Sequence, residues 1–350
     1  MRCPLKTKLK TSWNICGIAL AWACALACTL KAQDFYVTDA GGTVGEYGLD
    51  GSTVNASLIT GFSESMGIAL CGTNLFVTDA NYGTVGEYTT SGQTVNASLI
   101  TGLNRPSGIA VSGTNIFVSN EWSDCVAEYT TSGTLLNAAL ITGLDFPNGI
   151  AISGTNLFVA NINSGTVGEY TTSGATVNAS LITGLMYPEG LTISGNELFI
   201  ADSGQSYIPV YTTSGAFVTS ISGIGLQVPL SVAVYGNDVF VSCGGDGYFG
   251  EYTSSGATVN MDLFSSSAAW GIAITPMPLP VLSSPVFSNG RLQVAVTCSS
   301  NLTYIVQSAA DLLSTNWVSL LVTNPPSGFF SFTDPSATNQ QRFYRLALAQ

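Results

Sequence analysis

A repeated unit of 41 residues runs along the middle of the chain and restricts its fold more than any other feature. An aromatic residue followed by Val or Ile marks each copy, at Tyr36, Phe76, Phe117, Phe158, Phe199 and Phe240. The last five lie 41 residues apart, and the first gap is 40 because one loop is a residue shorter. A fixed period of this length, with short apolar runs and turns rich in Gly, Ser and Asn, is typical of a propeller or a solenoid.

Each unit divides into four strand-like runs. In residues 108–143 these runs are 108–111, 115–119, 126–130 and 134–142, and turn-forming Ser, Gly, Thr and Asn residues separate them. Four short antiparallel strands are the blade of a β-propeller, which cannot bury its two faces without neighbours. We therefore predict an all-β protein built from stacked four-stranded blades.

The repeats are out of phase with the ends of the repeated region. The region opens at residues 35–37 with the second run of a unit, and the missing first run comes last, at residues 271–274. A closed ring explains this order, because residues 271–274 then complete a blade whose other three strands come from residues 35–60. An open solenoid would not need such an exchange, which also removes an open sheet edge. We predict a six-bladed β-propeller over residues 33–275, closed by exchange of its N- and C-terminal strands.

Three short motifs give the repeat a resemblance to known proteins. They are Pro-x-Gly-Ile-Ala-Val, as at residues 106–111, Leu-Phe-Val-Ala-Asp/Asn, as at 157–161, and Gly-Thr-Val-x-Glu-Tyr, as at 165–170. Over residues 35–275 the chain resembles NHL-type six-bladed propellers, which are similar to the gluconolactonase and regucalcin family. The resemblance implies the fold and leaves the function open, because such folds serve enzymes, receptors and scaffolds.

Residues 1–32 have the character of a secretory signal peptide. A basic start is followed by an apolar run over residues 15–30, which is short for a membrane span. Ala25-Leu26-Ala27 offers a cleavage site, and cleavage after Ala32 is the alternative. Cys28 leaves open a lipoprotein anchor, although the large aliphatic residue of such a signal is missing. We expect secretion, to the outside, the periplasm or the cell surface.

Few positive charges remain once this segment is removed. From Gln33 onward the chain has four Arg and no Lys against 21 Asp and Glu, a net charge of −17. Such a surface repels nucleic acid and anionic membranes and is compatible with cations, neutral glycans or protein partners. The chain has no His, which excludes His-dependent nucleophilic catalysis, the His-dependent lyases among propellers and most zinc chemistry.

One position of the repeat varies while its neighbours recur. It lies just before each innermost strand, and its six residues are Met66, Ser107, Asn148, Glu189, Leu230 and Trp270. In a propeller these positions surround one mouth of the central channel. We predict that they form the ligand-binding site.

The family resemblance implies a metal site at the same position. Lactonase-like relatives take metal ligands from it, and Asn148 in Pro-Asn-Gly and Glu189 in Pro-Glu-Gly match their pattern. A hard cation such as Ca²⁺ needs six or more oxygens, however, and Met66, Leu230 and Trp270 supply none. Two ligands and Ser107 make a weak site for Ca²⁺ or another divalent cation, so we expect no cofactor and a partly polar channel mouth.

Two further positions of the repeat carry polar residues. The second strand ends in Asp39, Asp79, Asn120, Asn161 and Asp202, with Cys243 in the sixth place, and we predict turns that hold the next loop rather than a ring of metal ligands. Acidic residues precede a Tyr in the third strand at Glu46, Glu87, Glu128, Glu169 and Glu251. Because cations are so scarce, we expect these Glu on a solvated face and the Tyr residues between blades.

The cysteines outside residues 1–32 do not recur at one position of the repeat. Cys71, Cys125, Cys243 and Cys298 occupy unrelated positions, so we predict isolated thiols.

Residues 276–284 read as a Pro-rich linker. Residues 285–350 contain five runs that alternate like strands, at 292–297, 303–307, 317–322, 329–333 and 343–348. We predict a β-sandwich-like module, which resembles a C-terminal module common on secreted bacterial repeat proteins.

Two classes of function fit this sequence. The favoured one is a secreted, monomeric, non-catalytic binding or scaffold propeller that recognises a protein or a glycan at the channel mouth. The alternative is a metal-dependent enzyme of the lactonase or hydrolase type that uses Asn148 and Glu189.

Overall fold

The computed structural model describes residues 34–223, 225–244, 247–265, 269–275, 281–288, 291–297, 304–309, 317–325, 329–334 and 343–348. These residues fall into two compact units, divided between Thr275 and Pro276. The predicted signal peptide over residues 1–32, with Cys28, lies outside the described residues. None of the described segments forms a helix that is long and apolar enough to cross a membrane.

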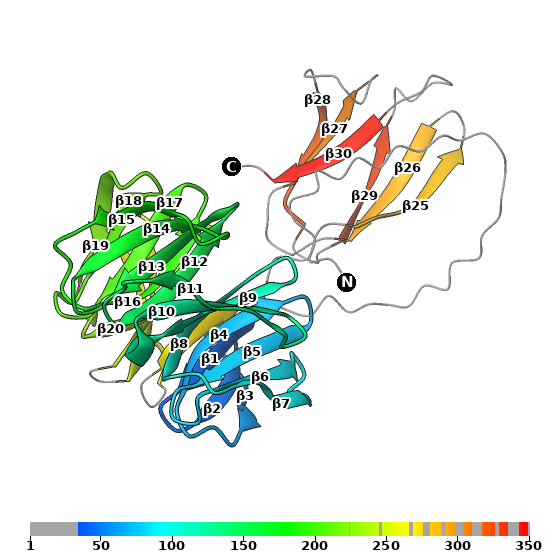
Figure 1. Ribbon diagram of the computed structural model, residues 1–350. Coiled ribbons are helices and arrows are strands. Elements are labelled where there is room, and N and C mark those ends of the chain that lie inside the picture. Colours follow the sequence, from blue (N-terminus) through cyan, green and yellow to red (C-terminus); the bar gives the residue numbers. More distant parts are fainter. Residues whose placement is uncertain are drawn as a thin grey trace. The chain divides into compact units, whose positions relative to one another are not determined.

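The first unit is an all-β, six-bladed propeller, as predicted (Figure 1). Each blade is an antiparallel four-stranded sheet whose strands follow one another from the channel outward. Five blades are continuous in sequence: β4 (Ser65–Cys71), β5 (Asn74–Asp79), β6 (Thr84–Thr89) and β7 (Thr94–Thr101); β8 (Pro106–Ser112), β9 (Asn115–Asn120), β10 (Cys125–Thr130) and β11 (Leu135–Thr142); β12 (Pro147–Ser153), β13 (Asn156–Asn161), β14 (Thr166–Thr171) and β15 (Thr176–Ile182); β16 (Pro188–Ser194), β17 (Glu197–Asp202), β18 (Ile208–Thr212) and β19 (Phe217–Ile221); β20 (Pro229–Tyr235), β21 (Asp238–Cys243), β22 (Tyr248–Thr253) and β23 (Thr258–Ser265). A 3₁₀ turn at Glu121–Ser123 follows β9.

The sixth blade closes the ring by strand exchange, which confirms the predicted phase of the repeat. Its sheet order is β24-β1-β2-β3, with β24 at Ala269–Ile274, β1 at Asp34–Asp39, β2 at Thr43–Gly48 and β3 at Thr53–Thr60. The pairing of β1 and β24 is antiparallel, with Phe35 opposite Ile274 and Val37 opposite Ile272. Two strands from opposite ends of the repeated region therefore become neighbours in one sheet.

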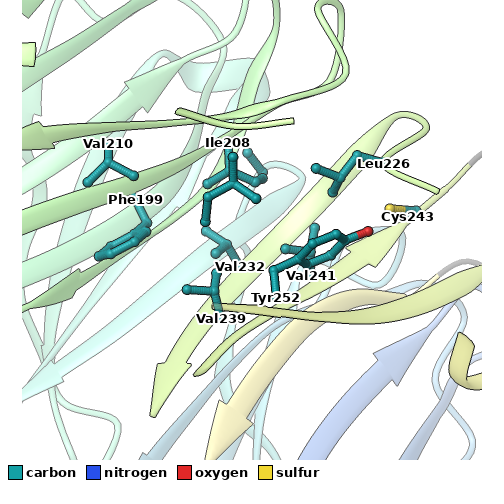
Figure 2. Packing of buried hydrophobic residues seen from close by; sticks show 11 residues of the cluster. Phe199, Ile208, Val210, Leu226, Val232, Val239, Val241, Cys243 and Tyr252 are labelled. Carbon is teal, nitrogen blue, oxygen red and sulfur yellow. The ribbon is translucent and has the colours of Figure 1, made fainter. Parts of the chain in front are cut away.

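The aromatic–aliphatic pair that marks each repeat packs against two different blades. Successive side chains of a strand point to opposite faces. Phe76 accordingly lies in a cluster with Val118 and Tyr129 of the next blade, whereas Val77 packs with Tyr36 of the preceding blade. The same alternation holds in all six blades, and Figure 2 shows one such interface, in which Phe199 and Val210 meet residues of β20 to β22. The repeated Tyr residues pack between blades, as predicted.

Each innermost strand contains a bulge close to its start. In β12, Pro147 pairs with Asn161 and Ile150 pairs with Val159, so Asn148 and Gly149 stand opposite a single residue. A hydroxyl on the second strand replaces ladder bonds at this point in three blades. Thr38 Oγ1 accepts a hydrogen bond from Gly271 N (2.8 Å) and donates one to Met66 O of the next blade (2.5 Å). Thr78 and Ser119 do the same in their blades.

The third-strand Glu residues do not lie on a solvated face, and that prediction was wrong. Asn74 Nδ2 donates to Glu87 Oε1 at 2.6 Å, and two further Asn–Glu pairs repeat the contact at 2.7 and 2.6 Å, Asn115–Glu128 and Asn156–Glu169. Glu46 is buried and accepts a bond from the Tyr36 hydroxyl. An amide at the start of the second strand thus provides the donors that Lys or Arg supplies in other proteins.

The Asx residues bind backbone, and the predicted turn that holds the next loop is only part of their role. Asp39 accepts a bond from Thr43 N in the loop that follows it. Asn120, Asn161 and Asp202 accept bonds from backbone N–H groups 16 residues earlier, in the loop that leads into their own blade, and Asp202 also accepts bonds from the following loop. Asp79 binds both loops. These side chains therefore fix the backbone next to the channel mouth.

The described cysteines of the propeller are thiols rather than halves of disulfides. Cys71 is partly buried, and Cys125 and Cys243 are fully buried. Burial raises the pKa of the Cys243 thiol to about 11, which makes it a poor nucleophile. Cys298 lies outside the described residues.

The second unit contains two three-stranded sheets. Their orders are β25-β26-β29 and β28-β27-β30, with β25 at Val281–Ser288, β26 at Arg291–Thr297, β27 at Tyr304–Ala309, β28 at Val318–Thr323, β29 at Phe329–Asp334 and β30 at Phe343–Leu348. Val294, Val306 and Phe332 come from both sheets and share one core, as in the predicted sandwich. The sequence does not predict strand β25. It indicates a linker at residues 276–284 and places the first strand-like run of the module at residues 292–297. Pro285 lies where the pairing of β25 shifts register, a position that tolerates proline.

Closure of the ring should depend on the Thr38 hydroxyl. We expect Thr38→Val to lower the free energy of unfolding of the propeller by about 1–3 kcal/mol, because Gly271 N–H and Met66 C=O lose a buried partner. Urea unfolding followed by tryptophan fluorescence measures the change. Thr176→Val, the same substitution on the exposed strand β15, is the control and should change stability by less than about 0.5 kcal/mol. Equal effects of the two substitutions would contradict a special role for Thr38.

Candidate functional site

A cavity of about 290 Å³ lies at the channel and is lined by the innermost strands of all six blades. All six residues predicted from the sequence line it: Met66, Ser107, Asn148, Glu189, Leu230 and Trp270. They stand within the innermost strands rather than before them, because these strands begin one residue earlier, at the bulge. A bulge redirects a side chain out of the ladder, which here gives each blade one residue at the mouth of the channel.

Glycine next to the mouth residue allows the blades to come together. A Cβ atom at Gly108 would overlap the carbonyl oxygen of Asn148 in the next blade, and one at Gly67 would overlap that of Ser107. The backbone of one blade therefore lies directly against the bulge of the next.

The lining of the cavity is divided into a polar and an apolar half. Three successive blades contribute Ser107, Asn148 and Glu189, and the next three contribute Leu230, Trp270 and Met66. A ligand in this cavity would meet a carboxylate on one side and hydrocarbon on the other. A ring of six equivalent ligands for a metal ion is excluded by the same order.

Arg105 is the only Lys or Arg between residues 34 and 275, and it lies beside the mouth. Its Nη1 and Nη2 atoms bind the two oxygens of Glu64, each at 3.0 Å, and its Nε atom binds Glu121 Oε2 at 2.6 Å. The guanidinium carbon lies 5.7 Å from the ring centroid of Trp122. Two carboxylates thus share the single cation of the propeller.

Asn148 connects this ion pair to the third carboxylate. Its Nδ2 atom donates to Glu121 Oε1 at 3.3 Å and to Glu189 Oε2 at 2.9 Å. The two acceptor oxygens are therefore at most about 6 Å apart. Only the amide of Asn148 lies between the carboxylate of Glu189 and that of Glu121.

Glu189 is the least neutralised of the three acids. Burial raises its pKa to about 7, and the nearby charge of Glu121 adds to the increase, against a smaller opposing effect of a hydrogen bond from Ser203. Burial also raises the pKa of Glu121, which the Arg105 guanidinium counteracts. Glu189 therefore exchanges a proton with solvent near neutral pH.

The residues present do not fit a hard divalent cation. Asn148 turns its N–H donors, not its carbonyl oxygen, toward Glu121 and Glu189. Within the described parts of the chain no three acidic, Cys or His side chains are grouped as metal ligands. The apolar half of the mouth leaves too few oxygens for Ca²⁺. That the protein has no cofactor stays a prediction.

Sequence reasoning missed Glu64, Arg105 and Glu121, although the repeat contains signals for all three. Glu64 and Arg105 stand two residues before a mouth residue, where other blades have Phe146, Tyr187 or Val228. Glu121 directly follows the Asx position, where other blades have small or apolar residues. A charged residue at a repeat position that is otherwise uncharged marks the site.

Large apolar side chains are exposed on the loops at this end of the propeller. We call this end the mouth face: it comprises the loops before each innermost strand and after each second strand. Hydrogen bonds tie the two kinds of loop together, as from Ser203 N to Tyr187 O and from Glu121 N to Arg105 O. Its exposed apolar residues are Tyr82, Trp122, Met186, Tyr187 and Val228.

Comparisons with known proteins agree with the fold and do not identify a family. No family model and no curated protein matches the sequence. A chain of a nidogen–laminin complex superimposes with a TM-score of 0.60 at 20% identity, over 69% of this chain and 98% of that one. A catalytically inactive virginiamycin B lyase from Staphylococcus aureus, crystallised with quinupristin, gives 0.52 at 17% identity, over 77% and 93%. A gluconolactonase from Xanthomonas campestris gives 0.50 at 16% identity, over 58% and 76%.

The raised pKa of Glu189 predicts how stability depends on pH. A carboxyl group whose pKa rises from 4.5 to about 7 on folding holds its proton more tightly in the folded state. Stability should therefore fall as the pH rises from about 4.5 to 7, by up to about 3 kcal/mol before solvent screening of the half-buried group reduces this figure. Glu189→Gln cannot ionise and should lose this part of the decline, so that the variant is more stable than the wild type at pH 8 and equally stable at pH 4.

Urea unfolding at pH 4, 6 and 8 measures this difference. Glu197→Gln, at the start of β17, is the control for removal of one negative charge. Parallel stability profiles for the wild type and Glu189→Gln would show that Glu189 has an ordinary pKa.

Proposed function

We propose that the protein is a non-catalytic binding protein and that its mouth face receives a protein partner. The observation that carries the proposal is an acidic mouth whose single cation is already neutralised, surrounded by exposed aromatic side chains. Such a surface attracts a partner of opposite charge and offers it anchoring residues.

The acidic residues of the mouth face favour a basic partner. Eight of them lie on its loops or at the ends of its strands: Asp39, Glu64, Asp79, Glu121, Asp124, Asp145, Glu189 and Asp202. Arg105 is their only counter-charge in the propeller. An uncompensated field of one sign increases the association rate of oppositely charged partners and rejects partners of like charge.

The exposed aromatic residues favour a protein interface. Trp and Tyr dominate the binding energy of such interfaces, since they bury a large area at low entropic cost. Trp122 is 64% exposed and Tyr82 is 67% exposed, which is unusual for side chains of this size. The Arg105 guanidinium lies over the Trp122 ring, a contact that favours one position of the indole before any partner arrives.

The chemistry of the mouth speaks against catalysis. The Ser107 hydroxyl is bound to Ser119 Oγ and Pro147 O, and no His is present to activate it. The alternative, a metal-dependent lactonase or hydrolase that uses Asn148 and Glu189, has one observation in its favour: a carboxyl with a pKa of about 7 suits general acid–base catalysis. It lacks a histidine to activate a hydroxyl nucleophile and enough oxygen ligands for a metal.

The similar folds include both kinds of protein. One belongs to a complex of nidogen with laminin, and two are enzymes, a lyase and a gluconolactonase. The first supports the idea that a propeller of this type binds another protein. The signal-like residues 1–32 support an encounter outside the cytoplasm, with a secreted or surface protein as the partner.

Selection from a random peptide display library tests the proposal without a known partner. We expect the immobilised propeller to enrich peptides rich in Lys or Arg with flanking aromatic residues, and Trp122→Ser to reduce their binding at least 10-fold. Phe217→Ser, which removes an exposed aromatic from the outer strand β19, is the matched control and should have no effect. Peptides that bind the Trp122→Ser variant equally well, or binding confined to a glycan array run in parallel, would overturn the proposal.

A further inference from the structure

The cavity at the channel mouth can take one side chain of a partner, and its lining restricts which one. Its volume of about 290 Å³ is at the lower limit for sites that hold drug-sized ligands. An oligosaccharide or a folded loop would not fit within it. A single long side chain would fit within this cavity.

The polar half of the cavity is prepared for a positively charged nitrogen. Asn148 Nδ2 already lies within hydrogen-bond distance of both Glu121 and Glu189, so a nitrogen between two carboxylates is accommodated by the geometry. This nitrogen is neutral and leaves the charge of Glu189 uncompensated. Arg105 cannot compensate it, because its guanidinium is bound to Glu64 and Glu121.

The apolar half of the cavity fits a hydrocarbon stem. Leu230, Trp270 and Met66 line the cavity from three adjacent blades. A Lys side chain has four methylene groups between its ammonium and its backbone, and such stems pack on apolar surfaces while the charge stays in a polar environment. Arg has a planar, forked head that needs paired acceptors in one plane, which suits this narrow cavity less well.

We propose that the channel mouth is a pocket for a peptidyl lysine, whose ammonium binds Glu189 beside Asn148 and whose stem packs on Leu230, Trp270 and Met66. This proposal deepens the function proposed above and rests on it. The indole N–H of Trp270 is buried and bonds to none of the described residues.

N-acetyl-lysine N-methylamide is the probe, and NMR chemical shifts of the Trp270 indole N–H report its binding at pH 8. We expect a dissociation constant of about 1 mM, which is usual for a ligand of this size. N-acetyl-norleucine N-methylamide has the stem without the charge and should bind at least 10-fold more weakly, since a charge-assisted hydrogen bond is lost.

Two substitutions assign the binding to the pocket. Glu189→Gln keeps the shape of the site and should weaken the lysine compound at least 10-fold, whereas the control Glu197→Gln should leave its affinity unchanged. Asn148→Lys should supply the ammonium from within the chain and abolish binding, while Asn148→Met, of similar length and uncharged, should be less stable than Asn148→Lys at pH 8.

Equal affinity for the lysine and norleucine compounds, or no effect of Glu189→Gln, would overturn the lysine pocket. If lysine fails to bind while selected peptides still require Trp122, the pocket is wrong and the docking face stands. If neither the probe nor any selected peptide binds the mouth face, both proposals fail.

Discussion

Each blade of this propeller is stable only between two others, because its second strand buries side chains on both faces. The aromatic residue of the repeat faces the next blade, and the aliphatic residues on either side of it face the preceding one. No single blade contains a complete hydrophobic core, because each core is formed by residues of two neighbouring blades. The exchange of β24 into the blade of β1 is therefore a requirement of the packing, since an open ring would leave two apolar faces in water.

The scarcity of cations shapes the polar interactions in the same way. With one Arg in the propeller, carboxylates other than Glu64 and Glu121 depend on amides, hydroxyls and backbone N–H groups instead of on salt bridges. Neutral donors satisfy the hydrogen bonds of a carboxylate without cancelling its charge. The negative charge accordingly remains uncancelled at the surface.

Much of the fold and part of the site follow from the periodicity of the sequence. The number of blades, the closing strand and the six mouth residues are all consequences of repeat phase, which is visible in the positions of Phe76 and its equivalents. The bulge at Asn148, the Asn74–Glu87 bond and strand β25 depend on register and side-chain neighbours, which a single strand does not reveal. One rule would have found more of the site. Residues 41 apart become neighbours at the innermost strands, as Glu64 with Arg105 and Asn148 with Glu189, so charges should be compared across one full repeat.

The pairing of β1 with β24 also determines how the propeller responds to mechanical force. The ladder is antiparallel and begins with bonds between Asp34 and Thr275, so both chain ends leave from the same end of the strand pair. Tension applied through the two ends would load these hydrogen bonds one after another, as in a zipper, and not all at once. The cores shared between blades would oppose such opening only after these first bonds have broken.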